Sequence, residues 1–212
     1  MPESVEGVTV AGTGRVPVSP DVLMVWFGAE VTDPAVRDAV SRCSDAISAM
    51  LNVLRQRGVV DRDLQTAGAS LYQAHDPGGA PRGWTASQEL SARLRNFDRA
   101  GDLVNAVLDA AGPLARLRNL RFDVDRTTER YFVARTEARR RAFGDAETAA
   151  QQYAELAGRR LGVVMSVREG DAGYSPPVPM RSMSFASAQG APVEQGELDV
   201  MTTVEVRWEL LS

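Results

Sequence analysis

The sequence predicts an α+β fold: a mainly antiparallel sheet with three helices packed on it, in the order β-β-α-β-β-α-β-α-β-β. Three observations support this prediction. The chain opens with two apolar runs, 8–18 and 22–31, three later segments repeat apolar residues at helical spacing, and other segments alternate apolar and polar residues. Alternation of this kind indicates strands with one buried face, which are typical of antiparallel sheets.

The first apolar run is predicted to be a strand joined by a short polar turn to the second, which is the most continuously apolar run of the chain. Gly12 and Gly14 resemble the start of a nucleotide-binding loop. That loop requires a third glycine followed by a helix, whereas Pro17 and Pro20 exclude a helix start here. We therefore expect a bulged or bent edge strand rather than a phosphate site.

The first two helices are predicted from their start and stop signals. Asp33 and Pro34 suit the N-cap and the first helical position, and Gly58 ends the first helix. Its apolar stripe consists of Val36, Val40, Cys43, Ile47, Met50 and Leu54. The second helix begins near Phe97 and ends at Gly112. Each of these helices therefore has one apolar face to bury.

The third helix is predicted from about Thr128 to Leu161, with Thr127 or Thr128 as its cap and Gly162 at its end. One face is rich in alanine and consists of Ala134, Ala138, Ala142, Ala146, Ala149, Tyr153 and Leu156. Small residues on this face indicate a close approach to the sheet or to another helix.

The remaining strands are predicted at 64–74, 83–96, 114–125, 163–168 and 198–211, with a glycine- and proline-rich loop at 75–82. At 212 residues the chain suits one large domain or two closely packed halves. Because no linker divides the sequence, we expect a single domain spanning 1–212.

Residues 171–197 differ sharply in composition from the rest, with four prolines among serine, glycine and alanine. Such a segment buries little and is predicted to form a flexible arm. Met180, Met183 and Phe185 would be exposed apolar residues on this arm in a monomer. We therefore predict that these three residues contact a partner subunit in a homo-oligomer.

Side chains suited to catalysis are few and scattered. Cys43 lies within the first helical stripe without a neighbouring histidine, so a core residue is expected rather than a nucleophile. The only histidine, His75, is followed by Asp76, which strand geometry turns to the opposite face, so an exposed loop histidine is expected. Asp123 and Asp125 would share a strand face, where a solvated strand end is a simpler interpretation than acid–base chemistry. No catalytic, cofactor-binding or metal-binding residue is predicted.

The charge balance argues against nucleic-acid binding. The net charge is −4, and all 24 basic residues are arginine, which also excludes lysine chemistry. Arg139, Arg140 and Arg141 cannot share one helix face, so we expect them to be solvated rather than to form an anion site. No stretch is apolar enough for a membrane helix, and the first residues lack the features of a signal peptide. A soluble, cytoplasmic protein is therefore expected.

Several groups of residues occur in an order and spacing similar to those of a known family. They are Val10–Gly14 with Pro20 and Asp21, Gly58 and Val59 before Asp63–Thr66, Trp84–Ser87, Leu161 and Gly162 before Val167–Glu169, and Gly196–Leu198. On these residues the chain resembles the SIMPL-domain (DUF541) family, which includes periplasmic and outer-membrane immunogenic proteins of bacteria. The resemblance covers essentially Val8 to Leu210.

The resemblance implies antiparallel strands with helices on the sheet, a tendency toward ring-like or higher oligomers, and links to the cell envelope and stress protection. It transfers no catalytic residue, and the missing export signal departs from the envelope-associated members. We therefore expect a non-enzymatic assembly or binding protein with no cofactor. The alternative is a small-molecule binding protein or an uncharacterised hydrolase, with a pocket between sheet and helices near His75, Asp123 or Asp125.

Overall fold

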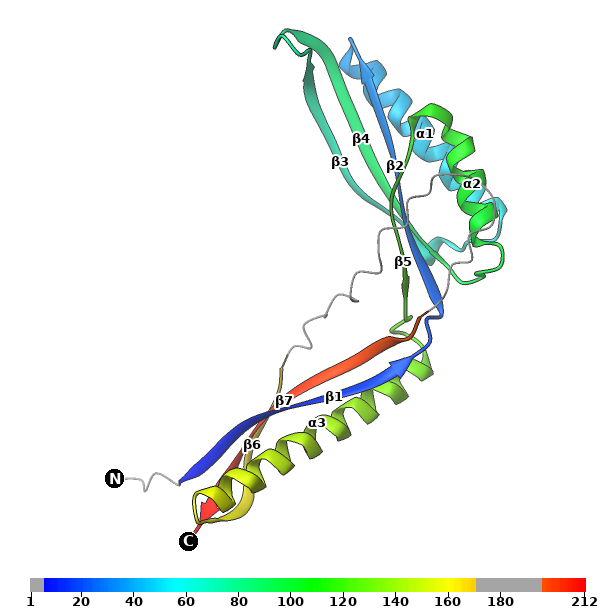
Figure 1. Ribbon diagram of the computed structural model, residues 1–212. Coiled ribbons are helices and arrows are strands. Elements are labelled where there is room, and N and C mark those ends of the chain that lie inside the picture. The colour runs from blue at the N-terminus through cyan, green and yellow to red at the C-terminus, as the bar shows by residue number, and fades with distance from the viewer. Residues whose placement is uncertain (1–5, 171–195) are drawn as a thin grey trace. The chain divides into compact units, whose positions relative to one another are not determined.

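The computed structural model describes residues 6–170 and 196–212, which belong to two compact units (Figure 1). The inserted unit is the continuous stretch Asp21–Asp123, and the split unit combines Met1–Pro20 with Val124–Ser212. The three predicted oligomer contacts, Met180, Met183 and Phe185, lie outside the described residues.

The inserted unit is a four-stranded antiparallel sheet with two helices on one face (Figure 1). Its elements are β2 (Val22–Asp33), α1 (Val36–Gln56), β3 (Leu64–His75), β4 (Pro81–Leu94), α2 (Ala100–Ala111) and β5 (Ala115–Asp123), with short 3-10 turns at Asp61–Asp63 and Gly112–Leu114. The strand order is β3-β4-β2-β5. The most apolar strand of the sequence, β2, is therefore paired on both sides, and β3 and β5 form the edges.

Alternate residues of β2 face the helices and form the centre of the core. Leu23, Val25 and Phe27 are at most 4% exposed. The buried face of α1 consists of Ala39, Cys43, Ala46, Ile47, Met50 and Leu54. The predicted stripe is thus confirmed from Cys43 onward, whereas Val36 and Val40 are exposed because the first turn directs Ala39 to the core instead.

The predicted helix cap Asp33 lies two residues before the observed N-cap, Ala35. Asp33 is the last residue of β2. Its carboxylate accepts a hydrogen bond from the Ala35 N–H (3.1 Å) and forms an ion pair with Arg42 (3.0 Å). Asp33 therefore stabilises the turn into α1, although the helix itself begins at Val36.

The split unit is a three-stranded antiparallel sheet with one long helix on one face (Figure 1). Its elements are β1 (Gly7–Val18), α3 (Glu129–Leu156), β6 (Arg160–Gly170) and β7 (Leu198–Leu211), in the strand order β1-β7-β6. Thr128 caps α3 as predicted, since its hydroxyl accepts the Tyr131 N–H. The helix ends earlier than predicted because Gly158, with φ of 68°, stops it, so Gly162 lies in β6.

Close packing between β1 and α3 explains the Gly-x-Gly sequence. Alanine occupies every fourth position of the buried helix face, at Ala134, Ala138, Ala142, Ala146, Ala150 and Ala154. A Cβ added to Gly12 would lie 2.5 Å from the Ala146 nitrogen, and one added to Gly14 would lie 2.6 Å from the Ala142 nitrogen. The two backbones leave no room for a side chain, so the predicted close approach of the alanine face is confirmed.

The first strand is an edge strand, as expected, but the expectation of a bulge in it is wrong. The register of β1 with β7 is continuous from Gly7 opposite Glu209 to Val18 opposite Leu198. The glycines are needed for helix packing rather than for a bend in the strand. The predicted alanine face also differs at its C-terminal end: Ala150 and Ala154 are buried, whereas Tyr153 is 57% exposed.

The predicted fold class and order of ten elements are confirmed. The two opening strands, however, lie in different sheets, since β1 pairs with β7 and β2 pairs with β4 and β5. The pairing of the first predicted strand with the last one brings residues near both ends of the sequence into one sheet.

Candidate interaction surface

His75 and Asp76 lie at the exposed end of the β3–β4 hairpin. His75 is the last residue of β3 and is exposed, as predicted. The Asp76 carboxylate accepts hydrogen bonds from the Gly78 and Ala80 N–H groups, both at 2.9 Å. Asp76 therefore shapes the loop rather than orienting the imidazole.

The two acidic residues at the end of β5 do not share a strand face, so that prediction is wrong. Asp123 ends β5 in the inserted unit and lies 3.3 Å from the Arg121 guanidinium. Asp125 follows the strand, belongs to the split unit and is only 6% exposed. Its carboxylate accepts the N–H (2.9 Å) and the hydroxyl (2.7 Å) of Thr127, which shapes the turn before α3.

The residues named for a small-molecule pocket do not converge within the inserted unit. His75 is on β3 and pairs with Pro81, the first residue of β4. Asp123 is on β5, at the other edge of the sheet, where it pairs with Val22. Strand β4 ends with Leu94 at this end of the sheet, whereas it begins at the end where His75 lies. These side chains therefore lie at diagonally opposite corners of one sheet.

Cys43 is the core residue that the sequence predicts. It is 3% exposed, and its thiol donates a weak hydrogen bond to the Ala29 carbonyl oxygen at 3.4 Å. Burial raises the pKa of the Cys43 thiol, so the reactive thiolate is disfavoured.

The three consecutive arginines of α3 are held by carboxylates. Arg140 and Arg141 both bond to Glu137, and they lower the pKa of its carboxyl to about 2, with Arg140 contributing most. Arg139 contacts Glu169 at 3.0 Å and is the main cause of the lowered pKa of that carboxyl. This stretch is an exposed ion-pair network and not a free anion site.

Across residues 6–170 and 196–212, no three His, Cys, Asp or Glu side chains gather closely enough to hold a metal ion. Over the same ranges, no helix has the length and apolar character needed to span a membrane.

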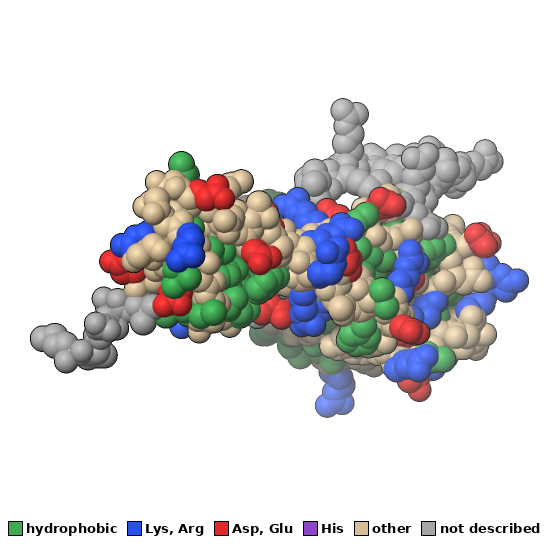
Figure 2. Space-filling view, turned by 90° about the horizontal axis from the view of Figure 1, so that it is seen from below, with side chains coloured by type: hydrophobic (Ala, Val, Ile, Leu, Met, Phe, Trp, Pro, Cys, Tyr) green, Lys and Arg blue, Asp and Glu red, His purple; other side chains and the backbone are tan. Residues whose placement is uncertain are grey.

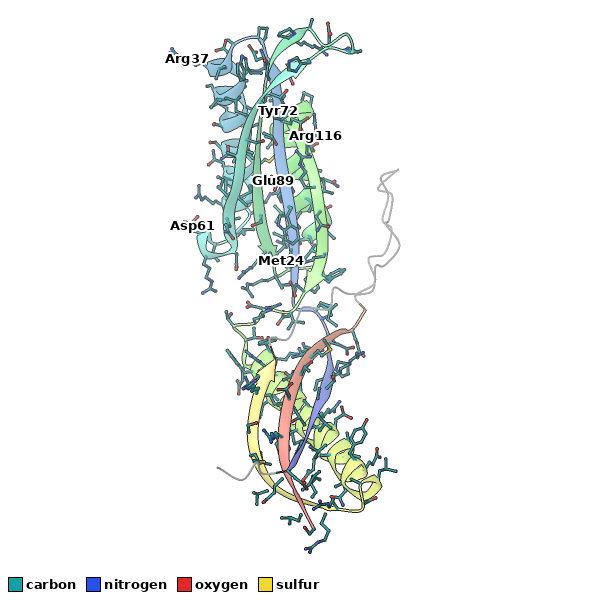
Figure 3. The ribbon with its side chains drawn as sticks, turned by 90° about the vertical axis from the view of Figure 1, so that its left-hand side faces the viewer. Met24, Arg37, Asp61, Tyr72, Glu89 and Arg116 are labelled. Atoms are coloured by element: carbon teal, nitrogen blue, oxygen red, sulfur yellow. The ribbon has the colours of Figure 1, made fainter. Side chains whose placement is uncertain are left out.

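The sheet face of the inserted unit away from α1 and α2 is polar (Figure 3). Labelled there are Met24, Tyr72, Glu89 and Arg116, one from each of its four strands. The Arg118 side chain lies over Gly28, where a side chain would obstruct it, and forms ion pairs with Glu30 (3.4 Å) and Glu89 (3.7 Å). These contacts join three strands and account for the charged residues of this face.

The two edges of the split-unit sheet differ in their protection. At the outer edge of β1, the Thr13 N–H donates to the Asp145 carboxylate (2.9 Å) and the Arg15 carbonyl accepts from Arg141 (2.7 Å). Both protecting side chains come from α3. One outward N–H and one outward carbonyl of this edge are thus occupied, which hinders the addition of another strand at Thr13–Arg15.

The other edge is the β6 edge, which we define by four exposed apolar residues. Val163, Val164, Met165 and Val167 are 70%, 42%, 40% and 53% exposed. The ladder with β7 shifts register on both sides of Val164, so that Val163 and Met165 have no β7 residue opposite them. Figure 2 shows hydrophobic side chains gathered in patches between charged ones on one side of the molecule.

A second exposed apolar surface lies on the outer face of α3. Phe132 and Val133 are 53% and 63% exposed there. They line a shallow groove of about 620 Å³ together with Glu129, Thr136, Glu137 and Arg140. The split unit therefore presents apolar side chains both on its helix and on one sheet edge, a combination typical of protein–protein contact surfaces.

Sequence comparison identifies the family. The family model described as "SIMPL: Protein of unknown function (DUF541)" matches residues 8–208. The chain belongs to the SIMPL family. The 26 kDa periplasmic immunogenic protein of Brucella melitensis is 26% identical to it, over 96% of this chain and 84% of the relative. The protein YggE of Escherichia coli K12, described as uncharacterised, is 24% identical over 90% of this chain and 75% of the relative.

Solved structures add little to this assignment for the SIMPL chain. The crystal structure of AtUAH in complex with (S)-hydroxyglycine has a TM-score of 0.27 and 15% identity, covering 57% of this chain and 29% of that one. A score this low supports no argument about fold or function. The expectation of a cytoplasmic location finds no support, since the Brucella relatives are named as periplasmic proteins.

The sequence interpretation did not identify the β6 edge or the outer face of α3 as contact surfaces. The signal for the β6 edge was the stretch Leu161–Val167, which contains neither charge nor proline. Such stretches also occur in buried strands, and only the strand order β1-β7-β6 shows that this one lies at an edge. For α3, Phe132 and Val133 lie on the face opposite the alanines.

Proposed function

We propose that this SIMPL-family protein is a non-enzymatic assembly protein that associates with further copies of itself in the periplasm. The observation that carries the proposal is the concentration of exposed apolar side chains on the split unit, at the β6 edge and on the outer face of α3. Surfaces of this kind favour association because contact removes apolar area from water.

The proposal includes a role for the segment between β6 and β7. Its residues Met180, Met183 and Phe185 are apolar, and we propose that they add to the contact between copies. The periplasmic location is proposed from the names of the Brucella relatives.

The mass of the native particle tests the assembly. Multi-angle light scattering of the purified full chain is expected to give a defined multiple of the monomer mass. The variant Met180→Ser/Met183→Ser/Phe185→Ser is expected to shift the particle toward smaller species. A monomer at every concentration, for both proteins, would contradict the proposal. Cell fractionation with periplasmic and cytoplasmic marker proteins tests the location, and recovery with the cytoplasmic marker would contradict that part.

A further inference from the structure

The shallow groove on the outer face of α3 contains two exposed apolar side chains and lies in the N-terminal half of the helix. Phe132 and Val133 are 53% and 63% exposed, and Glu129 and Thr136 are exposed beside them. Large apolar side chains that lie together at a surface favour a covering contact, because contact removes their area from water. The groove therefore suits an apolar occupant.

Both ends of the segment between β6 and β7 lie beside the same half of α3. Near the end of β6, the Glu169 carboxylate bonds to Arg139 at 3.0 Å. At the start of β7, Leu198 packs against the cluster that contains Ala134. The chain that connects the two strands, residues 171–195, therefore leaves from and returns to the part of α3 in which the groove lies.

The length of the connecting chain is sufficient to reach the groove. Ten residues lead from Gly170 to Met180, and thirteen lead from Phe185 to Leu198. Ten extended residues span up to about 35 Å. The groove residues, within 129–140, occupy only about 17 Å of the helix. The apolar residues in the middle of the segment can therefore lie over the groove without strain on either end.

We infer that the segment between β6 and β7 docks on the α3 groove of its own chain. Its three apolar residues, Met180, Met183 and Phe185, would cover the two exposed apolar side chains of the groove, and unbranched methionine suits an irregular apolar surface. The same chain is favoured over a second copy, because ends held beside the groove give the segment an effective concentration on the order of millimolar. The inference goes beyond the proposed function and concerns a single copy. In the proposed assembly, the docked segment would then face the next copy.

The charges of the segment and the groove are complementary. Arg181 lies between two of the three apolar residues and is the only basic residue of the segment. In the groove, the Glu137 carboxylate is held by Arg140, whereas the exposed Glu129 forms no ion pair with any described residue. A pair between Arg181 and Glu129 would fix the direction in which the segment crosses the groove.

Disulfide trapping in the full chain tests the docking. The only native thiol, Cys43, is 3% exposed, so an introduced pair of cysteines reports alone. The variant Val133→Cys/Met183→Cys is expected to form a disulfide within one chain about tenfold faster than Leu156→Cys/Met183→Cys. Leu156 is the matched control, because it is 83% exposed on the same helix but lies about 35 Å further along it. Equal rates for the two variants would overturn the inference.

Isotope labelling distinguishes the same chain from a second copy. Heavy-isotope-labelled and unlabelled Val133→Cys/Met183→Cys are mixed in urea, refolded together and oxidised, and the disulfide-linked peptides are weighed by mass spectrometry. Docking within one chain gives linked peptides of a single isotope. Linked peptides that combine the two isotopes in statistical proportion would overturn the inference and support a contact between copies instead.

Charge reversal tests the pair between the segment and the helix. Glu129→Arg and Arg181→Glu are each expected to slow formation of this disulfide by about twofold to fivefold, and the two changes together are expected to restore its rate. Glu147→Arg is the control at an exposed position further along α3 and should leave the rate unchanged. A combined variant as slow as the single ones would overturn the pairing. A native particle that is monomeric at every concentration would contradict the assembly proposal without affecting this inference.

Discussion

The contact between β1 and α3 leads to a strong prediction for the variant Gly14→Ala. The added Cβ would lie 2.6 Å from the Ala142 nitrogen, and ordinary contact begins near 3.4 Å, so at least 0.8 Å of movement is needed. The obstructing atoms belong to the helix backbone, which cannot swing aside as a side chain can. We expect a loss of about 3 kcal/mol in the free energy of unfolding of the split unit, at the upper end of typical overpacking costs.

Trp208 provides the assay, because it is 2% exposed and its ring lies 6.0 Å from that of Phe143 under α3. With Trp26 and Trp84 replaced by Phe, urea unfolding followed by fluorescence reports on the split unit alone. Gly144→Ala is the control, since a Cβ there meets nothing within 4 Å and alanine suits a helix interior better by roughly 1 kcal/mol. Equal stabilities for Gly14→Ala and the reference protein would refute the close-packing argument.

Three further predictions follow from single residues. Thr202 is 1% exposed, and its hydroxyl has no hydrogen-bond partner among the described residues. Thr202→Val is therefore expected to raise the free energy of unfolding by about 1 kcal/mol. Thr203→Val is the control and should change it little, because Thr203 is partly exposed. The pKa of the Glu137 carboxyl is lowered from 4.5 to about 2, so its ion pairs add stability that is present above about pH 4.5 and is lost as the pH falls toward 2. NMR titration of this carboxyl should show the low midpoint in the native chain and a higher midpoint in Arg140→Gln. A midpoint near 4 in the native chain would contradict this prediction. Burial raises the pKa of the Cys43 thiol, so Ellman's reagent should label it only in denaturant, and rapid labelling of the native protein would count against its core position.

Local signals in the sequence were sufficient for the elements themselves. The alternating pattern of β4 and the four- and three-residue spacing of α1 each reflect a single buried face, which the sequence records directly. The alanine-rich face of α3 likewise predicted a close approach before its partner was known. The burial of Ala150 and Ala154 could not be predicted from the sequence. Residues spaced strictly by four rotate gradually around a helix with 3.6 residues per turn, so the spacing alone does not show that they stay on the buried face.

The division into two sheets was not predictable from local patterns. Strands β1 and β2 follow each other with only three residues between them, and consecutive strands usually pair. The property that separates them is long-range: Gly12 and Gly14 fit only against the alanine face of α3, more than a hundred residues later. The candidate contact surfaces were missed for the same reason, since edge position and exposure depend on the complete strand order.

The insertion of one unit within the other imposes an order on folding when the chain emerges N-terminus first into the compartment where it folds. The inserted unit is continuous, and its first and last residues are joined by a hydrogen bond from the Asp21 N–H to the Asp123 carbonyl (3.2 Å). It can therefore fold as soon as it has emerged. Strand β1 emerges first, but its partner among the described strands is β7, so it must wait until Leu198–Leu211 has emerged. Until then β1 lacks its strand partner, so a chaperone acting on the emerging chain would find its target at the N-terminal strand.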